Sequence, residues 1–136
     1  MARTIVTPIQ KRFSDVDVFR HVNNVSQQMY FDVGKTEYYR QVLNNSVLFG
    51  SLRIITVATQ TSYISQIRYE DDIYVTTEVS KIGNKSLTLF QRIICREADG
   101  SERICTESTS AMVAFDFDEQ TSAVVPDLWR EAILSE

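Results

Sequence analysis

The residues of this sequence that are best equipped for chemistry lie in one short segment, which runs from Asp15 to Asn24. This segment holds two aspartates, two asparagines and the one histidine of the chain. Asp17 could act as a nucleophile or as the base that activates a water molecule. The same residue types also form ordinary turns, helix caps and buried hydrogen bonds, so a purely structural role remains open.

A long helix is predicted directly after this segment. Asn23 and Asn24 are good capping residues, and apolar side chains recur at three- and four-residue steps from Val25 to Leu43. The amino end of a helix presents unpaired N–H groups and a partial positive charge, which can hold a developing oxyanion. The apolar face is wide, which predicts an enclosed helix, and Gly34 indicates a close approach of another backbone.

From Ser51 onward the apolar residues alternate with a period of two, which predicts an antiparallel sheet. Gly83-Asn84 supplies residues tolerant of positive φ, and with Asp99-Gly100 it is typical of tight hairpins. Together with one strand before the helix, this order predicts an α+β domain with one helix packed on one sheet. The expected strands are Thr4 to Phe13, Ile55 to about Tyr69 with an acidic turn at Glu70-Asp71-Asp72, Ile73 to Val79, Leu87 to Cys95, and Ile104 to Phe117. A short amphipathic helix with a packed Trp129 is expected over Pro126–Glu136.

Size and charge restrict the function classes. A chain of 136 residues predicts a single domain over 1–136. Its net charge of −4 argues against a nucleic-acid or membrane partner. The sequence shows neither a signal peptide nor a membrane span, which predicts a cytoplasmic protein with reduced cysteines. Cys95 and Cys105 lie on either side of an Asp-Gly turn and could face each other on paired strands.

Other chemistries find little support. A single histidine excludes a metal site built on several histidines, so we expect no metal, and neither a phosphate-binding glycine loop nor a G-x-S-x-G motif occurs. We therefore expect no cofactor. A thioester suits this sparse equipment, because its carbonyl is less resonance-stabilised than that of an amide and its thiolate leaves readily.

The segment from Phe13 to Asn24, followed by Tyr30-Phe31-Asp32, resembles the signature of the 4-hydroxybenzoyl-CoA thioesterase-like acyl-CoA thioesterases. Their pattern reads approximately aromatic-x-Asp-x-Asp-x-x-Gly-His-Val-Asn-Asn, then Tyr-Phe-Glu on the long helix. The resemblance implies the hot-dog fold, a five-stranded curved antiparallel sheet wrapped around one long central helix. It also implies hydrolysis of an acyl-CoA or acyl-carrier-protein thioester.

The family's residue roles transfer by position. Asp17 stands where the family has its catalytic carboxylate, and His21 and Asn24 stand near the thioester carbonyl or the helix entrance. Val22 and Asn23 complete the motif as substrate-binding residues. Family members place each active site between subunits and bind CoA phosphates with basic side chains, for which Lys85 and the adjacent Ser86 are candidates here. Asp32 and Lys35, which replace the family's Glu and Arg, are candidates for interface or structural roles.

Arg20 departs from the family pattern, because a glycine precedes the histidine there. Its guanidinium could steer an anionic acyl group or a phosphate, which makes Arg20 a further substrate-binding candidate.

A non-catalytic acyl-CoA-binding module and a hot-dog dehydratase are the alternatives. An exposed edge strand predicts at least a homodimer, and a homotetramer is plausible. The acyl pocket is expected to depend on Tyr38, Phe49, Tyr63 and Phe90.

Overall fold

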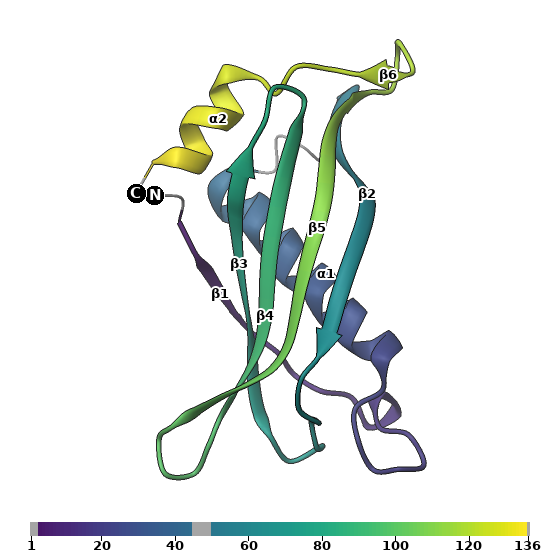
Figure 1. Ribbon diagram of the computed structural model, residues 1–136, viewed down its shortest axis with the longest axis vertical. Helices are drawn as coiled ribbons and strands as arrows, with labels where there is room; N and C mark the ends of the chain where they lie inside the picture. The colour runs from purple at the N-terminus through teal and green to yellow at the C-terminus, as the bar shows by residue number, and fades with distance from the viewer. Residues whose placement is uncertain (1–2, 45–49, 136) are drawn as a thin grey trace.

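The structure is a computed structural model that describes residues 3–44 and 50–135. An antiparallel sheet lies against one long helix, and a short helix covers one end (Figure 1). The elements in chain order are β1 (Ile5–Pro8), the 3₁₀-helix η1 (Phe13–Asp15), α1 (Asn24–Val42), β2 (Leu52–Tyr63), β3 (Asp72–Ile82), β4 (Ser86–Arg96), β5 (Glu102–Asp116), β6 (Thr121–Ser122) and α2 (Asp127–Leu134). This arrangement confirms the α+β hot-dog fold. The predicted pocket residue Phe49 lies outside the described residues.

The strand order is β1-β3-β4-β5-β2, and the two-residue β6 pairs with β5. Both predicted hairpins are present, between β3 and β4 and between β4 and β5. Gly100 has a φ of 87°, as a tight turn demands. Gly83 has no positive φ and is small for a different reason, because an added Cβ would lie 2.6 Å from Ser86 Oγ.

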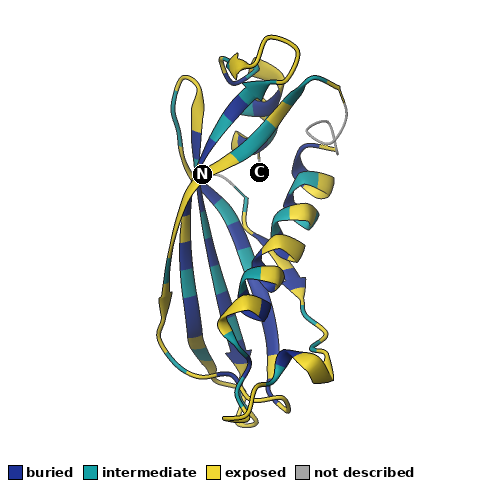
Figure 2. Cartoon of the chain, turned by 90° about the vertical axis from the view of Figure 1, so that its right-hand side faces the viewer, coloured by how far each residue is buried: buried dark blue, intermediate teal, exposed yellow. Residues whose placement is uncertain are grey.

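The predicted long helix is confirmed within one residue at each end. Its buried side faces the sheet and its other side, which includes Val25, Met29 and Val33, is exposed, so the prediction of an enclosed helix is wrong (Figure 2). Gly34 permits the close packing, since a Cβ there would lie 2.6 Å from Val75 Cγ1 and 2.9 Å from Thr77 Oγ1. The close neighbours are therefore side chains of β3 and not, as expected, a backbone.

The core has two apolar clusters beneath α1. One, near the start of α1, includes Phe31, Val75 and Ile93; the other, near its end, includes Trp129 of α2. The packing role predicted for Trp129 is thus confirmed. Polar residues paired across three strands separate the clusters: Thr77 opposite Gln91, and Gln91 opposite Ser108. All three are buried, and Gln91 Nε2 donates hydrogen bonds to Thr77 Oγ1 and to the carbonyl oxygen of Phe31 in α1.

Two strand boundaries were predicted wrongly. The first strand ends at Pro8 and does not reach Phe13, where Asp15 accepts a hydrogen bond from the Arg12 backbone N–H and the chain turns into η1. The second ends at Tyr63 and does not continue to Tyr69. The N–H groups of Ile64 and Ser65 both donate to the carbonyl oxygen of Cys105, at 2.9 and 3.0 Å, so the regular ladder stops there.

The two cysteines are free and buried in the same cluster, in agreement with their predicted reduced state. They are not directly opposite each other: Cys95 pairs with Arg103, and Cys105 lies where the register of β4 and β5 shifts. Burial raises the pKa of both thiols. None of the described helices has the length and apolar character needed to cross a membrane.

Candidate functional site

The segment from Val16 to Val22 forms a tight loop before α1. Val16 and Val22 form an isolated antiparallel bridge, and the Asp17 N–H donates to the His21 carbonyl oxygen at 3.1 Å. The Arg20 N–H donates to the Asp17 carbonyl oxygen at 2.9 Å. This turn requires a φ of 64° at Arg20, in the left-handed region that favours glycine. The position where the resemblance expects glycine therefore adopts a glycine-like backbone while carrying a long charged side chain.

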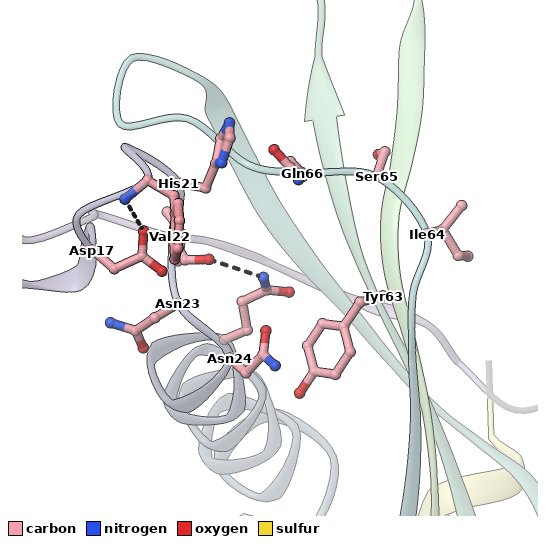
Figure 3. A pocket seen from close by; sticks show the side chains of 11 residues that line it. Asp17, His21, Val22, Asn23, Asn24, Tyr63, Ile64, Ser65 and Gln66 are labelled. Atoms are coloured by element: carbon pink, nitrogen blue, oxygen red, sulfur yellow. Dashed lines mark hydrogen bonds between the residues drawn. The ribbon is translucent and has the colours of Figure 1, made fainter.

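The Asp17 carboxylate is held by its own loop. Its Oδ1 accepts a hydrogen bond from the Phe19 N–H at 2.9 Å (Figure 3). Among residues 3–44 and 50–135, no hydrogen bond to Oδ2 is found, and the side chain is exposed at the edge of a pocket. One oxygen thus fixes the carboxylate while the other remains available.

Asp15, by contrast, is a structural anchor. Its side chain is fully buried and accepts hydrogen bonds from Tyr30 Oη at 2.5 Å, Ser26 Oγ at 3.0 Å and Arg12 Nη2 at 3.0 Å. Burial alone would raise the pKa of Asp15, but the hydrogen bonds from Tyr30, the Arg12 backbone and Ser26 outweigh it, and the pKa is lowered. The carboxylate therefore stays ionised inside the fold and joins the loop to the first two turns of α1.

Asn23 is the N-cap of α1. Its Oδ1 accepts from the Ser26 N–H at 2.8 Å, and its Nδ2 donates to the Asp15 carbonyl oxygen at 3.0 Å. Within the described part of the chain, the N–H groups of Asn24 and Val25 have no hydrogen-bond acceptor. The helix therefore begins with two open donors beside the Asp17 loop.

A pocket of about 380 Å³ lies between this loop, the first turn of α1 and the segment that follows β2 (Figure 3). The structure brings together five of the residues predicted from the sequence. These are Asp17, His21, Val22, Asn23 and Asn24, and all of them line the pocket. Val22 is buried and contributes backbone as well as side chain, because its carbonyl oxygen accepts a hydrogen bond from Gln27 Nε2.

His21 is half-buried at the rim of this pocket (Figure 3). Its backbone forms an isolated bridge with Arg68, which ties the loop to the segment after β2. No hydrogen bond joins its imidazole to the Asp17 carboxylate in the described structure. In the described structure His21 therefore lies at the rim of the pocket without the contact to Asp17 that a hydrogen-bonded pair would need.

Three predicted substrate-binding residues lie elsewhere. Arg20 lines a neighbouring hollow of about 480 Å³ with Phe13 and Tyr69, and Asp17 is shared by the two hollows. Lys85 and Ser86 lie at the hairpin between β3 and β4, at the end of the sheet opposite the amino end of α1 (Figure 1). The structure does not bring Lys85 or Ser86 to the pocket of their own chain.

Sequence reasoning missed several pocket residues. Gln27 is buried, donates to the Val22 carbonyl oxygen and accepts a hydrogen bond from Thr106 of β5. Helical spacing offered a signal, since Gln27 lies one turn after Asn23. Ile64, Ser65 and Gln66 were missed because they were assigned to a continuing strand.

Three of the side chains expected to set the depth of the acyl pocket lie among the described residues, and of these Tyr63 lines this pocket. Tyr38 belongs to the core cluster near α2. Phe90 points to the opposite face of β4, where it lies under the Arg92 guanidinium. No group of three or more His, Cys, Asp or Glu side chains that could hold a metal is found over residues 3–44 and 50–135.

The sequence and the fold of this chain are similar to those of known proteins. Residues 12–133 match the model of the thioesterase-like superfamily. The uncharacterized protein YsmA of Bacillus subtilis is 28% identical over 81 residues, 60% of this chain and 54% of that protein, so the chain spans about half the length of this relative. The structure of a predicted thioesterase from Bacillus stearothermophilus matches with a TM-score of 0.83 and 27% identity, covering 96% of this chain and 94% of that one. A mutant of 4-hydroxybenzoyl CoA thioesterase, complexed with 4-hydroxybenzoyl CoA, has the same fold with a TM-score of 0.87 and 16% identity, covering 97% and 99% of the two chains.

Proposed function

Because this chain belongs to the thioesterase-like superfamily, we propose that it hydrolyses an acyl-CoA thioester to a free acid and the CoA thiol. One observation carries the proposal: Asp17, which has an open carboxylate oxygen, and Asn24, which has an open N–H group at the start of α1, line the same pocket. A carboxylate can attack or activate water, and aligned N–H donors stabilise the negative charge that develops on the carbonyl oxygen. The neighbour bound to a CoA thioester supports CoA as the carrier of the acyl group.

The reaction needs few groups. With Asp17 as base, the carboxylate takes a proton from a water molecule while the water oxygen adds to the carbonyl carbon. The resulting oxyanion accepts a hydrogen bond from the open N–H group of Asn24 at the start of α1. Its collapse breaks the C–S bond and the thiolate leaves. With Asp17 as nucleophile, its own oxygen adds, the same bond breaks, and water then opens the acyl-enzyme.

The remaining pocket residues take supporting roles in this proposal. His21 and the Asn24 side chain orient the thioester at the rim. Asn23, whose side chain is occupied by the cap, positions the two open N–H donors. Val22 contributes an apolar wall. Arg20 belongs to the same loop as Asp17 and lines the neighbouring hollow, where its guanidinium attracts a phosphate of CoA.

The quaternary state is part of the proposal. β2 forms one edge of the sheet and most of its residues are exposed, so pairing with a second copy would cover it and give a homodimer. Lys85 and Ser86 can contact CoA only in a neighbouring copy, since they are remote from the pocket of their own chain. If the protein sediments as a monomer at micromolar concentration, the dimer is contradicted. The sedimenting mass also distinguishes a dimer from a tetramer. The cytoplasmic location stays a prediction.

The decisive experiment measures thiol release from short, medium and aromatic acyl-CoAs. We expect Asp17→Asn to lower kcat by at least about 100-fold, because the amide can neither accept the proton nor attack. Asp118→Asn is the matched control: it makes the same change at an exposed turn at the far end of the sheet and should keep full activity. Activity retained by Asp17→Asn, or absence of thiol release from every substrate, would refute the mechanism.

The non-catalytic alternative makes a different prediction. The observation that favours it is the left-handed backbone at Arg20. A long side chain stands there in place of the family's glycine, close to the candidate nucleophile Asp17. A binding module would show affinity for acyl-CoA by calorimetry without thiol release. An acyl-carrier-protein thioesterase would release thiol from the carrier-bound substrate faster than from the CoA ester.

A further inference from the structure

Tyr63 lines the pocket from the side of the sheet. It is the last residue of β2 and reaches toward the first turn of α1, beside Asn24 (Figure 3). Gln28, in the second turn of α1, donates from Nε2 to Tyr63 Oη at 3.2 Å and to Thr61 Oγ1 at 3.0 Å. The phenol is therefore tied to the helix at a defined position.

This tether leaves the phenolic proton free. Gln28 Nε2 is a donor, so Tyr63 Oη acts as the acceptor in their hydrogen bond. Over residues 3–44 and 50–135 no acceptor for the Tyr63 O–H is found, and 44% of the residue surface is exposed. Tyr63 thus presents to the pocket a positioned hydrogen-bond donor that a bound group could use.

Behind Tyr63 the sheet is lined with hydroxyl groups. Thr61 lies opposite Ser108 and Thr59 opposite Ser110, with oxygen–oxygen distances of 3.2 and 3.0 Å. These residues share a face with Tyr63, because alternate residues of a strand point to the same side. An alkyl chain extended past Tyr63 would break the Gln28 tether and lie against hydroxyls, which disfavour contact with apolar groups.

The negative charge of Asp17 disfavours acyl groups that are themselves anionic. Asp17 lines the same pocket of about 380 Å³, so a second negative charge bound there would be repelled. A neutral oxygen meets no such repulsion and can accept the Tyr63 proton.

Resting on the proposed thioesterase activity, we infer that the site selects short acyl groups that carry a neutral hydroxyl or keto oxygen, with Tyr63 as the specificity-determining donor. Gln28 is a positioning residue that acts through Tyr63. Long saturated acyl groups are poor substrates because the tethered phenol and the hydroxyl-lined sheet behind it block their path.

The test compares kcat/KM for 3-hydroxybutyryl-CoA, taken as each enantiomer, acetoacetyl-CoA, butyryl-CoA and decanoyl-CoA. We expect one oxygenated substrate to exceed butyryl-CoA by about tenfold or more, the effect of one well-placed hydrogen bond, and decanoyl-CoA to be the poorest. Tyr63→Phe should bring the oxygenated-to-butyryl ratio close to one. Tyr63→Ala should raise kcat/KM for decanoyl-CoA relative to that for butyryl-CoA, because it removes the side chain that blocks a long acyl group.

Gln28 is tested by two substitutions. Gln28→Glu places a carboxylate that accepts the phenolic proton, so the oxygenated-to-butyryl ratio should fall as in Tyr63→Phe. Gln28→Met removes the tether and should lower the ratio in the native background but not further in Tyr63→Phe, since the two residues act as one unit. If the two substitutions lower the oxygenated-to-butyryl ratio additively, Gln28 has a role of its own and does not act by positioning Tyr63.

A ratio near one in the native protein, a best rate with decanoyl-CoA, or an unchanged ratio in Tyr63→Phe would each overturn the inference while the thioesterase activity stands. If no substrate releases thiol, the proposed function fails. In that case the affinities for the same CoA esters, measured by calorimetry, test the selectivity of the site. Circular dichroism of each variant checks that it folds.

Discussion

The phenolic hydroxyl of Tyr30 donates a 2.5 Å hydrogen bond to the buried carboxylate of Asp15. This contact joins the second turn of α1 to the loop that carries Asp17. Burial, together with this hydrogen bond and the negative charge of Asp15, raises the pKa of Tyr30 far above its ordinary value. Asp15 thus belongs to the framework of the site, although it stands two residues from the candidate catalytic aspartate in the same motif.

Substitution of Asp15 should destabilise the protein strongly. Asp15→Ala leaves Tyr30, Ser26 and the Arg12 N–H without their shared acceptor, and we expect a loss of about 3 kcal/mol in the free energy of unfolding. Tyr30→Phe should cost about 1.5 kcal/mol, since one hydrogen bond to a charged group is removed. Urea unfolding measures both. Tyr69→Phe, at an exposed tyrosine, is the control, and a similar effect there would contradict the anchor.

Asp15 should also contribute to acid sensitivity. Its pKa is lower in the folded state than in the unfolded chain, so its contribution to stability is fully present above about pH 5. That contribution is lost as the pH falls through about 4 and then through the lower folded pKa, because the folded protein resists a proton that the unfolded chain accepts. Asp15→Asn should flatten this part of the dependence of the unfolding free energy on pH between 7 and 3. Equal slopes for the two proteins would argue against an ionised Asp15.

Gly34→Ala should destabilise the protein even though alanine favours helices. Alanine gains about 1 kcal/mol of helix propensity, but the new methyl group would overlap Val75 and Thr77 and cost about 1–3 kcal/mol. We expect a net loss in thermal unfolding. Thr36→Ala, at an exposed position of the same helix, should be neutral or stabilising. A stabilised Gly34→Ala variant would show that α1 can move away from the sheet.

The left-handed backbone at Arg20 predicts an asymmetry between two substitutions. Arg20→Gly removes a strain of about 1 kcal/mol and should preserve or raise stability. Arg20→Ala removes the guanidinium and keeps the strain, so it should not be more stable than the native protein. A comparison of KM for acyl-CoA in both variants isolates the effect of the charge. A more stable Arg20→Ala than Arg20→Gly would contradict the turn geometry.

The cysteines should be silent in the thiol-release assay. Both are buried and their pKa values are raised by burial, so little thiolate is exposed near neutral pH. In the native protein we expect a thiol reagent to react at least about 100-fold more slowly than with a free thiol. Reaction should reach two equivalents after unfolding in urea. Rapid labelling of the native protein would show that the cluster beneath the start of α1 opens.

Much of the local structure was predictable. The Asn23 cap and the two hairpins depend on contacts within a few residues, and Trp129 follows the period of its short helix. The boundaries at Pro8 and Tyr63 were not predictable from alternation. The chain beyond Pro8 turns into η1, where the Asp15 carboxylate accepts from the Arg12 N–H, and β2 stops where two N–H groups share the Cys105 carbonyl oxygen.

The amino acid order by itself specified the α+β architecture and placed Asp17 beside the start of a helix, because hydrophobic period and capping act over short distances. Which of two neighbouring aspartates is enclosed and which is open could be decided only by the folded chain. Asp15 is enclosed by Tyr30 from α1, and the pocket at Asp17 is completed by Tyr63 from β2. Such contacts join residues remote along the chain, and no local pattern encodes how distant segments pack against each other.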